Sequence, residues 1–96
     1  MTSYRLTARA EGEILEIFVY GIEQFGLRQA RLYKDEMERC FQLLSENPHM
    51  GRPATAIGKG VRRHEHKSHV ILYEIDRSGI LVIAVVHARS VRRLKL

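Results

Sequence analysis

The sequence predicts one α+β domain over residues 1–96: an N-terminal strand, an antiparallel helical hairpin and then a three-stranded antiparallel sheet. Two observations predict this class. Apolar residues recur every three or four positions through the first half of the chain, which is typical of amphipathic helices. The second half holds short, dense apolar runs bounded by turn residues, which is typical of strands.

The first half begins with a short strand candidate, Ser3–Thr7, and continues as a helix from Ala8. Gly26 is placed to cap the C-terminus of this helix. A second helix follows at once, and Asn47-Pro48 ends it. Because only a glycine turn separates the helices, we expect them to pack antiparallel. Their apolar faces consist of Ile14, Ile17, Phe18, Gly21, Ile22 and Phe25 on the first, and of Ala30, Tyr33, Met37, Phe41 and Leu44 on the second.

The second half begins with a loop rich in glycine and proline, Asn47–Gly60. Three strand candidates follow it, and the last of them is the most apolar. A charged edge strand is expected at Val61–Lys67, a second strand at His69–Ile75, a turn at Asp76–Gly79 and a third strand at Ile80–His87.

The last two strands carry apolar side chains on both faces, because alternate positions of a strand point in opposite directions. A hairpin of two helices covers only one face, so about five aliphatic side chains are left over. At roughly 1.5–3 kcal/mol each when buried, they hold on the order of 10 kcal/mol, and such a patch typically marks a binding surface. We expect a partner protein to bind these residues, which are Val70, Leu72, Leu81, Ile83 and Val85.

Two other arrangements explain the same apolar surface. The strand Ile80–His87 can be central, with the loop Asn47–Gly60 folded over the second face. Alternatively, two copies of the chain can associate through it.

The chain is basic, with a net charge of +5, and its end is a cationic tail. This charge favours an acidic partner, either nucleic acid or an acidic protein segment. The tail can bind phosphate or an acidic strand, or it can be a frayed, solvated terminus. Its cationic residues are Arg89, Arg92, Arg93 and Lys95.

Several classes of protein are not expected. The N-terminal stretch has no hydrophobic signal core, and no apolar run approaches the ~18 residues of a bilayer span, so we expect a cytoplasmic protein without membrane contact. The single cysteine, Cys40, is expected in the core rather than in a disulfide or as a nucleophile. We expect no metal, cofactor or small-molecule substrate, although His64, His66 and His69 lie close together in the sequence.

The ordered set of segments resembles the ParE group within the ParE/RelE toxin superfamily over nearly the whole chain. The resemblance rests on the strand-then-helix opening "YRLTARAEGEILEIFVYGIEQFGLRQARLY", on "NPHMGRPA", on "GVRRHEHKSHVILYEI" and on "ILVIAVVHAR". No single segment is specific, but their order is. The family often carries an aspartate shortly after the terminal histidine. Here the stretch from His87 to Ser90 has no acid, so no role is expected for that carboxylate.

The resemblance implies a RelE/ParE-like fold and the toxin half of a bacterial type II toxin–antitoxin pair. ParE-type toxins inhibit DNA gyrase by binding and are neutralised by a ParD-like antitoxin. RelE-type members instead cut messenger RNA on the ribosome, and this is the alternative function. A ribonuclease needs an acid, a base and arginines in one cleft. The candidates are His87, Arg89, Arg62, Arg63, Lys67 and Tyr73, but no matched acid–base pair stands out, so we favour a binding function.

Overall fold

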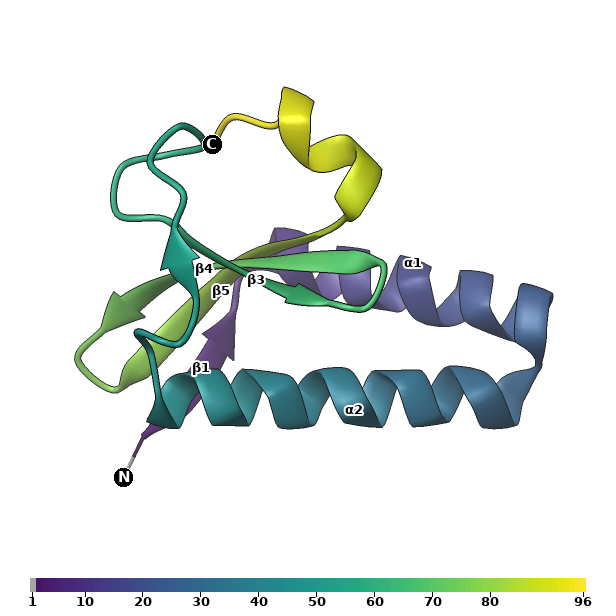
Figure 1. Ribbon diagram of the computed structural model, residues 1–96. Helices are drawn as coiled ribbons and strands as arrows, with labels where there is room; N and C mark the ends of the chain where they lie inside the picture. The colour runs from purple at the N-terminus through teal and green to yellow at the C-terminus, as the bar shows by residue number, and fades with distance from the viewer. Residues whose placement is uncertain (1) are drawn as a thin grey trace.

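A five-stranded sheet packs on two helices in the computed structural model, which describes residues 2–96 (Figure 1). The predicted succession of strand, helical hairpin and antiparallel strands is confirmed, with a short extra strand and a C-terminal 3-10 helix added. In chain order the elements are β1 (Ser3–Leu6), α1 (Ala8–Phe25), α2 (Leu27–Glu46), β2 (Arg52–Pro53), β3 (Arg62–His66), β4 (His69–Asp76), β5 (Gly79–His87) and the 3-10 helix η1 (Ala88–Arg93).

The hairpin is defined by a cap at its start and a glycine at its turn. The Thr7 hydroxyl accepts a hydrogen bond from the Ala10 N–H at 3.0 Å, an N-cap contact of about 1 kcal/mol. The same hydroxyl donates to the Ile83 carbonyl at 2.7 Å, which ties the start of α1 to β5. Gly26 lies between the helices with φ of 89°, a conformation that favours glycine. The chain therefore reverses direction within one residue.

The sheet has the strand order β1-β5-β4-β3-β2. The three-stranded antiparallel sheet that we predicted is present as β3, β4 and β5. It is extended on one side by β1, which pairs with β5 in parallel, and on the other by the two residues of β2. Strand β5 is therefore an interior strand, paired with β1 on one edge and with β4 on the other.

One face of the sheet is sealed by α1 and α2. Phe41 and Leu44 of α2 are fully buried there, as is Tyr73 of β4. We call this group the helix-side cluster. Its buried members are Ala10, Ile14, Met37, Phe41, Leu44, Ile71, Tyr73, Ile80, Val82 and Val85.

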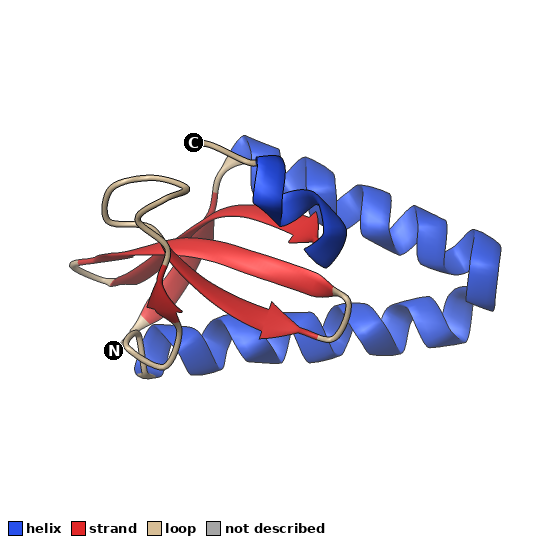
Figure 2. Cartoon of the chain, turned by 45° about the horizontal axis from the view of Figure 1, so that its top comes forward, coloured by secondary structure: helices blue, strands red, loops and turns tan. Residues whose placement is uncertain are grey.

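The second face of the sheet is covered by the chain itself. The loop that follows α2 and the C-terminal tail lie over it, on the side away from the helices (Figures 1 and 2). The prediction of an uncovered second face is therefore wrong, and the alternative, with β5 central and the loop Asn47–Gly60 folded over it, is confirmed. We call this group the second-face cluster. Its buried members are Ala54, Ile57, Val61, Val70, Leu72, Ala84, Val86 and Val91.

A β-bulge in β5 changes which side chains share a face. Leu72 pairs with Ala84 whereas Tyr73 pairs with Val82, so Ile83 has no residue opposite it. Strict alternation had placed Val85 on the second face, but the extra residue returns it to the helix-side cluster. The bulge had no signal in the apolar run of β5, where every residue is a plausible strand residue.

None of the helices within residues 2–96 is both long enough and apolar enough to cross a membrane.

Candidate functional site: the basic tail and the loop beside it

The C-terminal tail is docked on the sheet rather than frayed. The 3-10 helix η1 follows β5 directly, and its Val91 is only 8% exposed in the second-face cluster. Leu94 also packs against this cluster, and the Leu96 N–H donates to the Ile57 carbonyl at 2.8 Å. The tail and the loop therefore hold each other in place over the second face.

The docked tail presents its cations to solvent. Arg89, Arg92, Arg93 and Lys95 are all exposed. None of the four forms a salt bridge within the described part of the chain, residues 2–96. Unneutralised cations on a fixed backbone form a surface suited to an acidic or phosphate-bearing partner.

The loop beside the tail is held by Tyr73. This fully buried side chain donates to the Pro48 carbonyl at 2.6 Å and accepts from the Gly51 N–H at 3.0 Å. A Cβ added at Gly51 would lie 2.8 Å from the Arg63 carbonyl and would crowd the tyrosine hydroxyl. Tyr73 is thus a structural anchor, and its burial leaves no access for a substrate.

Arg62 and Arg63 also face the loop region. Arg62 donates from Nη2 to the Gly51 carbonyl at 2.5 Å, so its guanidinium is engaged with the chain itself. Arg63 lies 3.8 Å from Glu65, which also pairs with Arg52 at 2.7 Å. The Nε atoms of Arg62 and Arg63 are buried without a hydrogen-bond partner within residues 2–96.

Tyr33 of α2 contacts His66 and His69, and His69 in turn contacts His87; we call these four residues the imidazole cluster. The Tyr33 hydroxyl and His69 Nδ1 share a hydrogen bond of 2.6 Å. The Tyr33 ring centroid lies 5.3 Å from that of His66, and the His69 and His87 centroids lie 5.6 Å apart. Burial lowers the pKa of His69 and of His66, and the neighbouring His87 and Lys67, respectively, lower it further. These shifts favour the neutral rings of His66 and His69.

The ribonuclease candidates are not brought into one cleft. His87 pairs across the strands with His69, whereas Arg62 pairs with Tyr73, four residues further along β4. Four residues of strand separate these positions by about 13 Å. Arg89 follows His87 by two residues, and its backbone N–H donates to His87 Nδ1 at 3.1 Å. The candidates thus fall into two separate groups, His87 with Arg89 and Arg62 with Arg63 and Tyr73.

The last two kinds of candidate are metal-binding side chains and the single cysteine, Cys40. No group of three or more ligand-type side chains within residues 2–96 is arranged to hold a metal ion. Cys40 is half-buried against the helix-side cluster, and burial raises the pKa of its thiol, which disfavours the reactive thiolate.

The five residues expected to bind a partner are largely enclosed. Val70 and Leu72 are fully buried and Val85 is 2% exposed. Only Leu81 and Ile83 retain partial exposure, and Ile83 borders the second-face cluster. These five residues were expected to bind a partner because the face was expected to be uncovered, and that expectation is wrong. Contact between a partner and Leu81 or Ile83 stays a prediction.

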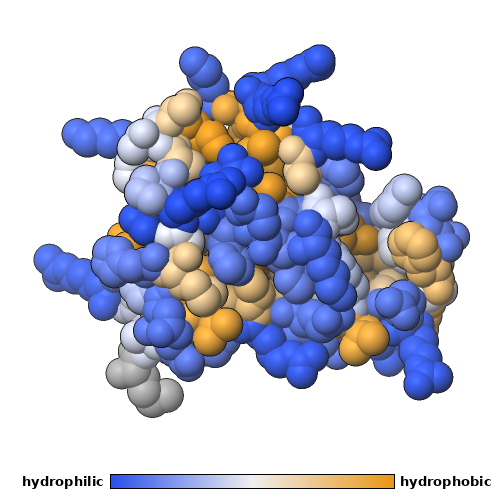
Figure 3. Space-filling model, viewed as in Figure 1, coloured by the Kyte–Doolittle hydropathy of each residue, from blue (hydrophilic) through white to orange (hydrophobic). Residues whose placement is uncertain are grey.

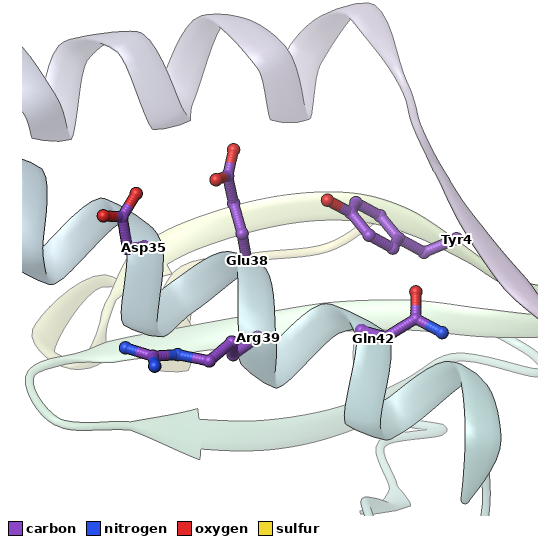
Figure 4. A pocket seen from close by; sticks show the side chains of 5 residues that line it. All are labelled: Tyr4, Asp35, Glu38, Arg39 and Gln42. Atoms are coloured by element: carbon purple, nitrogen blue, oxygen red, sulfur yellow. The ribbon is translucent and has the colours of Figure 1, made fainter.

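Two features of the site were missed by the sequence analysis. The Glu13 carboxylate accepts from the Val85 N–H at 2.8 Å, beyond the point where β1 has ended, so a side chain replaces the missing strand partner. A hollow of about 430 Å³ lies beside α2, and Figure 4 shows Tyr4 of β1 and Glu38 of α2 extending into the space between the helices. Burial, then the charge of Glu38, raises the pKa of Tyr4. Neither position interrupts a periodic pattern, so no signal for them exists in the sequence.

The order of strand, helical hairpin and antiparallel strands, closed by a docked tail, agrees with the RelE/ParE-like fold that the sequence resemblance implies. A family model described as the ParE toxin of the type II toxin–antitoxin system, parDE, matches residues 4–92. The chain belongs to this ParE toxin family.

Relatives and a solved structure agree with this assignment. The chain is 32% identical over 87 residues to Toxin ParE1 of Caulobacter vibrioides, covering 91% of this chain and 90% of that protein. It is 29% identical over 87 residues to Toxin ParE1 of Mycobacterium tuberculosis, covering 90% and 89%. A structure described as the chromosomal ParDE TA system from P. aeruginosa matches with a TM-score of 0.75 over 91% of this chain and 96% of that one. Its 19% identity supports the fold alone.

Proposed function

We propose that this ParE-family toxin acts in the cytoplasm by binding DNA gyrase through its basic tail, and that a ParD-like antitoxin neutralises it. The observation that carries the proposal is the docking of η1. Val91 fixes the backbone, so Arg89, Arg92 and Arg93 project from a rigid element instead of a mobile end. A rigid cationic surface loses little conformational entropy when it binds, which favours a binding toxin.

The dispersal of the catalytic candidates supports the same proposal. Tyr73 and Arg62 both hold the loop, through the Pro48 and Gly51 carbonyls, and they lie about 13 Å along the sheet from His87. A toxin that inhibits its target by binding needs a surface of complementary charge but no catalytic acid–base pair.

The test is inhibition of gyrase by purified protein. The double variant Arg92→Glu/Arg93→Glu should lose inhibition of supercoiling at stoichiometric toxin, because the reversal repels an acidic surface. The matched control is Arg77→Glu, which lies in the turn at the other end of β5, about 26 Å away along the strand. Unchanged supercoiling at excess wild-type toxin, or equal loss in both variants, contradicts the proposal.

For the antitoxin we propose contact with the part of the second face that the loop and tail leave partly open. Leu81 and Ile83 provide that apolar strip. The variant Leu81→Asp should weaken the complex with the cognate antitoxin in a titration, whereas Leu43→Asp, an exposed leucine on α2, should not. Equal affinity of the Leu81 variant and the wild type would place the antitoxin elsewhere.

One observation favours the ribonuclease alternative. His69 and His87 present two imidazoles 5.6 Å apart, beside Arg89, and histidine serves as acid or base near neutral pH. Under this alternative, His87→Ala abolishes cleavage of messenger RNA on translating ribosomes while antitoxin binding is retained. No cleavage by the wild-type protein excludes it.

A further inference from the structure

The helical hairpin extends beyond the sheet (Figures 1 and 2). It carries several large apolar side chains that are exposed. Leu15 is 62% exposed and Val19 is 46% exposed, and they lie four residues apart on one stripe of α1. At the end of the hairpin, Phe25 is 69% exposed, and Leu27 and Leu32 of α2 are each 49% exposed. Figure 3 shows hydrophobic patches at this end among hydrophilic neighbours.

The charges at the hairpin end oppose both helix dipoles. The last turn of α1 has no basic residue, and the exposed Glu23 lies there, beside the negative end of the helix. The first turn of α2 has no acidic residue and no side-chain cap, and Arg28 lies beside the positive end. Both residues therefore weaken their own helix, so their signs are not explained by the stability of the hairpin.

These charges are also unsatisfied within the molecule. Neither Glu23 nor Arg28 nor Arg31 forms a salt bridge within residues 2–96. A hollow of about 590 Å³ beside the start of α2 is open to a partner. It is lined by Leu27, Arg28, Gln29, Arg31, Leu32 and Asp35.

We propose that two copies of the chain associate through this hairpin surface, with α1 of each copy against the start of α2 of the other. The surface complements itself. On its α1 side, the exposed Glu11 and Glu23 continue the stripe of Leu15 and Val19 at four-residue spacing, whereas residues 27–31 of α2 carry two arginines and no acid. A two-fold axis then pairs Glu23 with Arg28 of the second copy twice, and the exposed leucines and Val19 become buried between the helices. Such an interface does not depend on toxicity or on the antitoxin.

The experiment is sedimentation of the full-length protein at several concentrations. Wild-type protein should sediment as a concentration-dependent dimer, weakened by added salt. Glu23→Arg and Arg28→Glu should each raise the dimer dissociation constant about tenfold or more, because each places like charges opposite one another. An equimolar mixture of the two variants should restore dimers, since the arginine introduced in one variant then faces the glutamate introduced in the other. The matched control, Glu74→Arg on the exposed part of β4, should leave the dimer unchanged.

The melting temperatures of the two variants show whether Glu23 and Arg28 act in association or in the stability of the monomer. Each reversal corrects a charge that opposes a helix dipole, so in the monomer the melting temperature should hold or rise while association is lost. A monomeric wild type, a mixture that does not recombine, or a dimer unaffected by both reversals overturns the proposal. So does a monomeric wild type whose affinity for its antitoxin falls in Glu23→Arg, because the surface then belongs to the antitoxin.

Discussion

The two faces of the sheet are covered in different ways. On one face, α1 and α2 contribute long apolar rows, including the fully buried Phe41 and Leu44. On the other face, a loop and a 3-10 helix contribute scattered side chains, among them Ile57 and Val91. The first cover consists of regular elements whose backbone is bonded internally. The second is held by a few separate contacts, such as the Tyr73 hydroxyl and the Leu96 N–H.

From this difference we expect the two covers to differ in stability. Loss of a contact on the helix side disturbs the common core, so the whole domain responds. We expect the loop and tail to open locally more readily than the helix face, because a few separate contacts hold them in place. A partner that displaces the tail therefore competes with a small local free energy rather than with the full free energy of unfolding.

The largest expected effect is on the helix side. Phe41→Ala should lower the free energy of unfolding by about 3–5 kcal/mol, because it leaves a cavity beneath the sheet. Leu43→Ala, the neighbouring exposed position, should change it by less than about 1 kcal/mol. Denaturant titration followed by circular dichroism measures both. Equal effects would show that the helix face is not the dominant core.

The next effect concerns the anchor of the loop. Tyr73→Phe leaves the Pro48 carbonyl and the Gly51 N–H without their partner and should cost about 1–3 kcal/mol. Hydrogen exchange should show the Gly51 amide losing protection while the amides of β5 keep theirs. Tyr20→Phe on exposed α1 serves as the control, since its hydroxyl makes no hydrogen bond within residues 2–96. Uniform loss of protection across the sheet would contradict separate stability of the second cover.

The same difference separates what sequence predicted from what it missed. The helices, Gly26 and the strands follow from periodicity and turn residues, which are local properties. The cover of the second face depends on Ile57 and Val91, isolated apolar residues in segments without periodicity. Their burial depends on where the loop and tail fold back. The loop Asn47–Gly60 over this face was only one of several arrangements that fitted the sequence, because no local pattern encodes such a fold-back.

Some features of the candidate site could be predicted from the sequence, and others could not. The cationic tail was visible in composition, and the structure shows Arg92 and Arg93 exposed on η1. The role of Tyr73 was not visible, because a buried hydroxyl that anchors a loop and a catalytic hydroxyl look alike in sequence. The bulge at Ile83 also had no signal, and it alone moved Val85 to the other face.

A smaller effect is expected at the tail. Val91→Ala removes two buried methyl groups and should cost about 1–2 kcal/mol, expressed as local release of η1. Amide exchange should quicken at Leu94 and Leu96, and gyrase inhibition should fall because the arginines are no longer fixed. The global denaturation midpoint should change little. Ser90→Ala is the matched control on the exposed side of the same 3-10 helix. A large global shift would mean that the tail belongs to the main cooperative core.

The smallest expected effect is the pH dependence of the free energy of unfolding that arises from the imidazole cluster. Burial lowers the pKa of His69, and the nearby His87 and His66 lower it further. Because the pKa of His69 is lower in the folded than in the unfolded chain, its contribution to the free energy of unfolding is fully present above about pH 6.5. It is lost as the pH falls through the folded pKa, because the unfolded chain binds the proton first.

Charged groups around the imidazole cluster also shift the pKa of His66. Lys67 lowers the pKa of His66, whereas Glu36 of α2 raises it, so the carboxylate offsets only part of the effect. His69→Asn should therefore flatten the fall in melting temperature between pH 7 and pH 5, and His49→Asn in the loop should not. The Tyr33 hydroxyl, which bonds His69 Nδ1, keeps a partner in the asparagine side chain. An unaltered pH profile in the His69 variant would place the acid sensitivity outside this cluster.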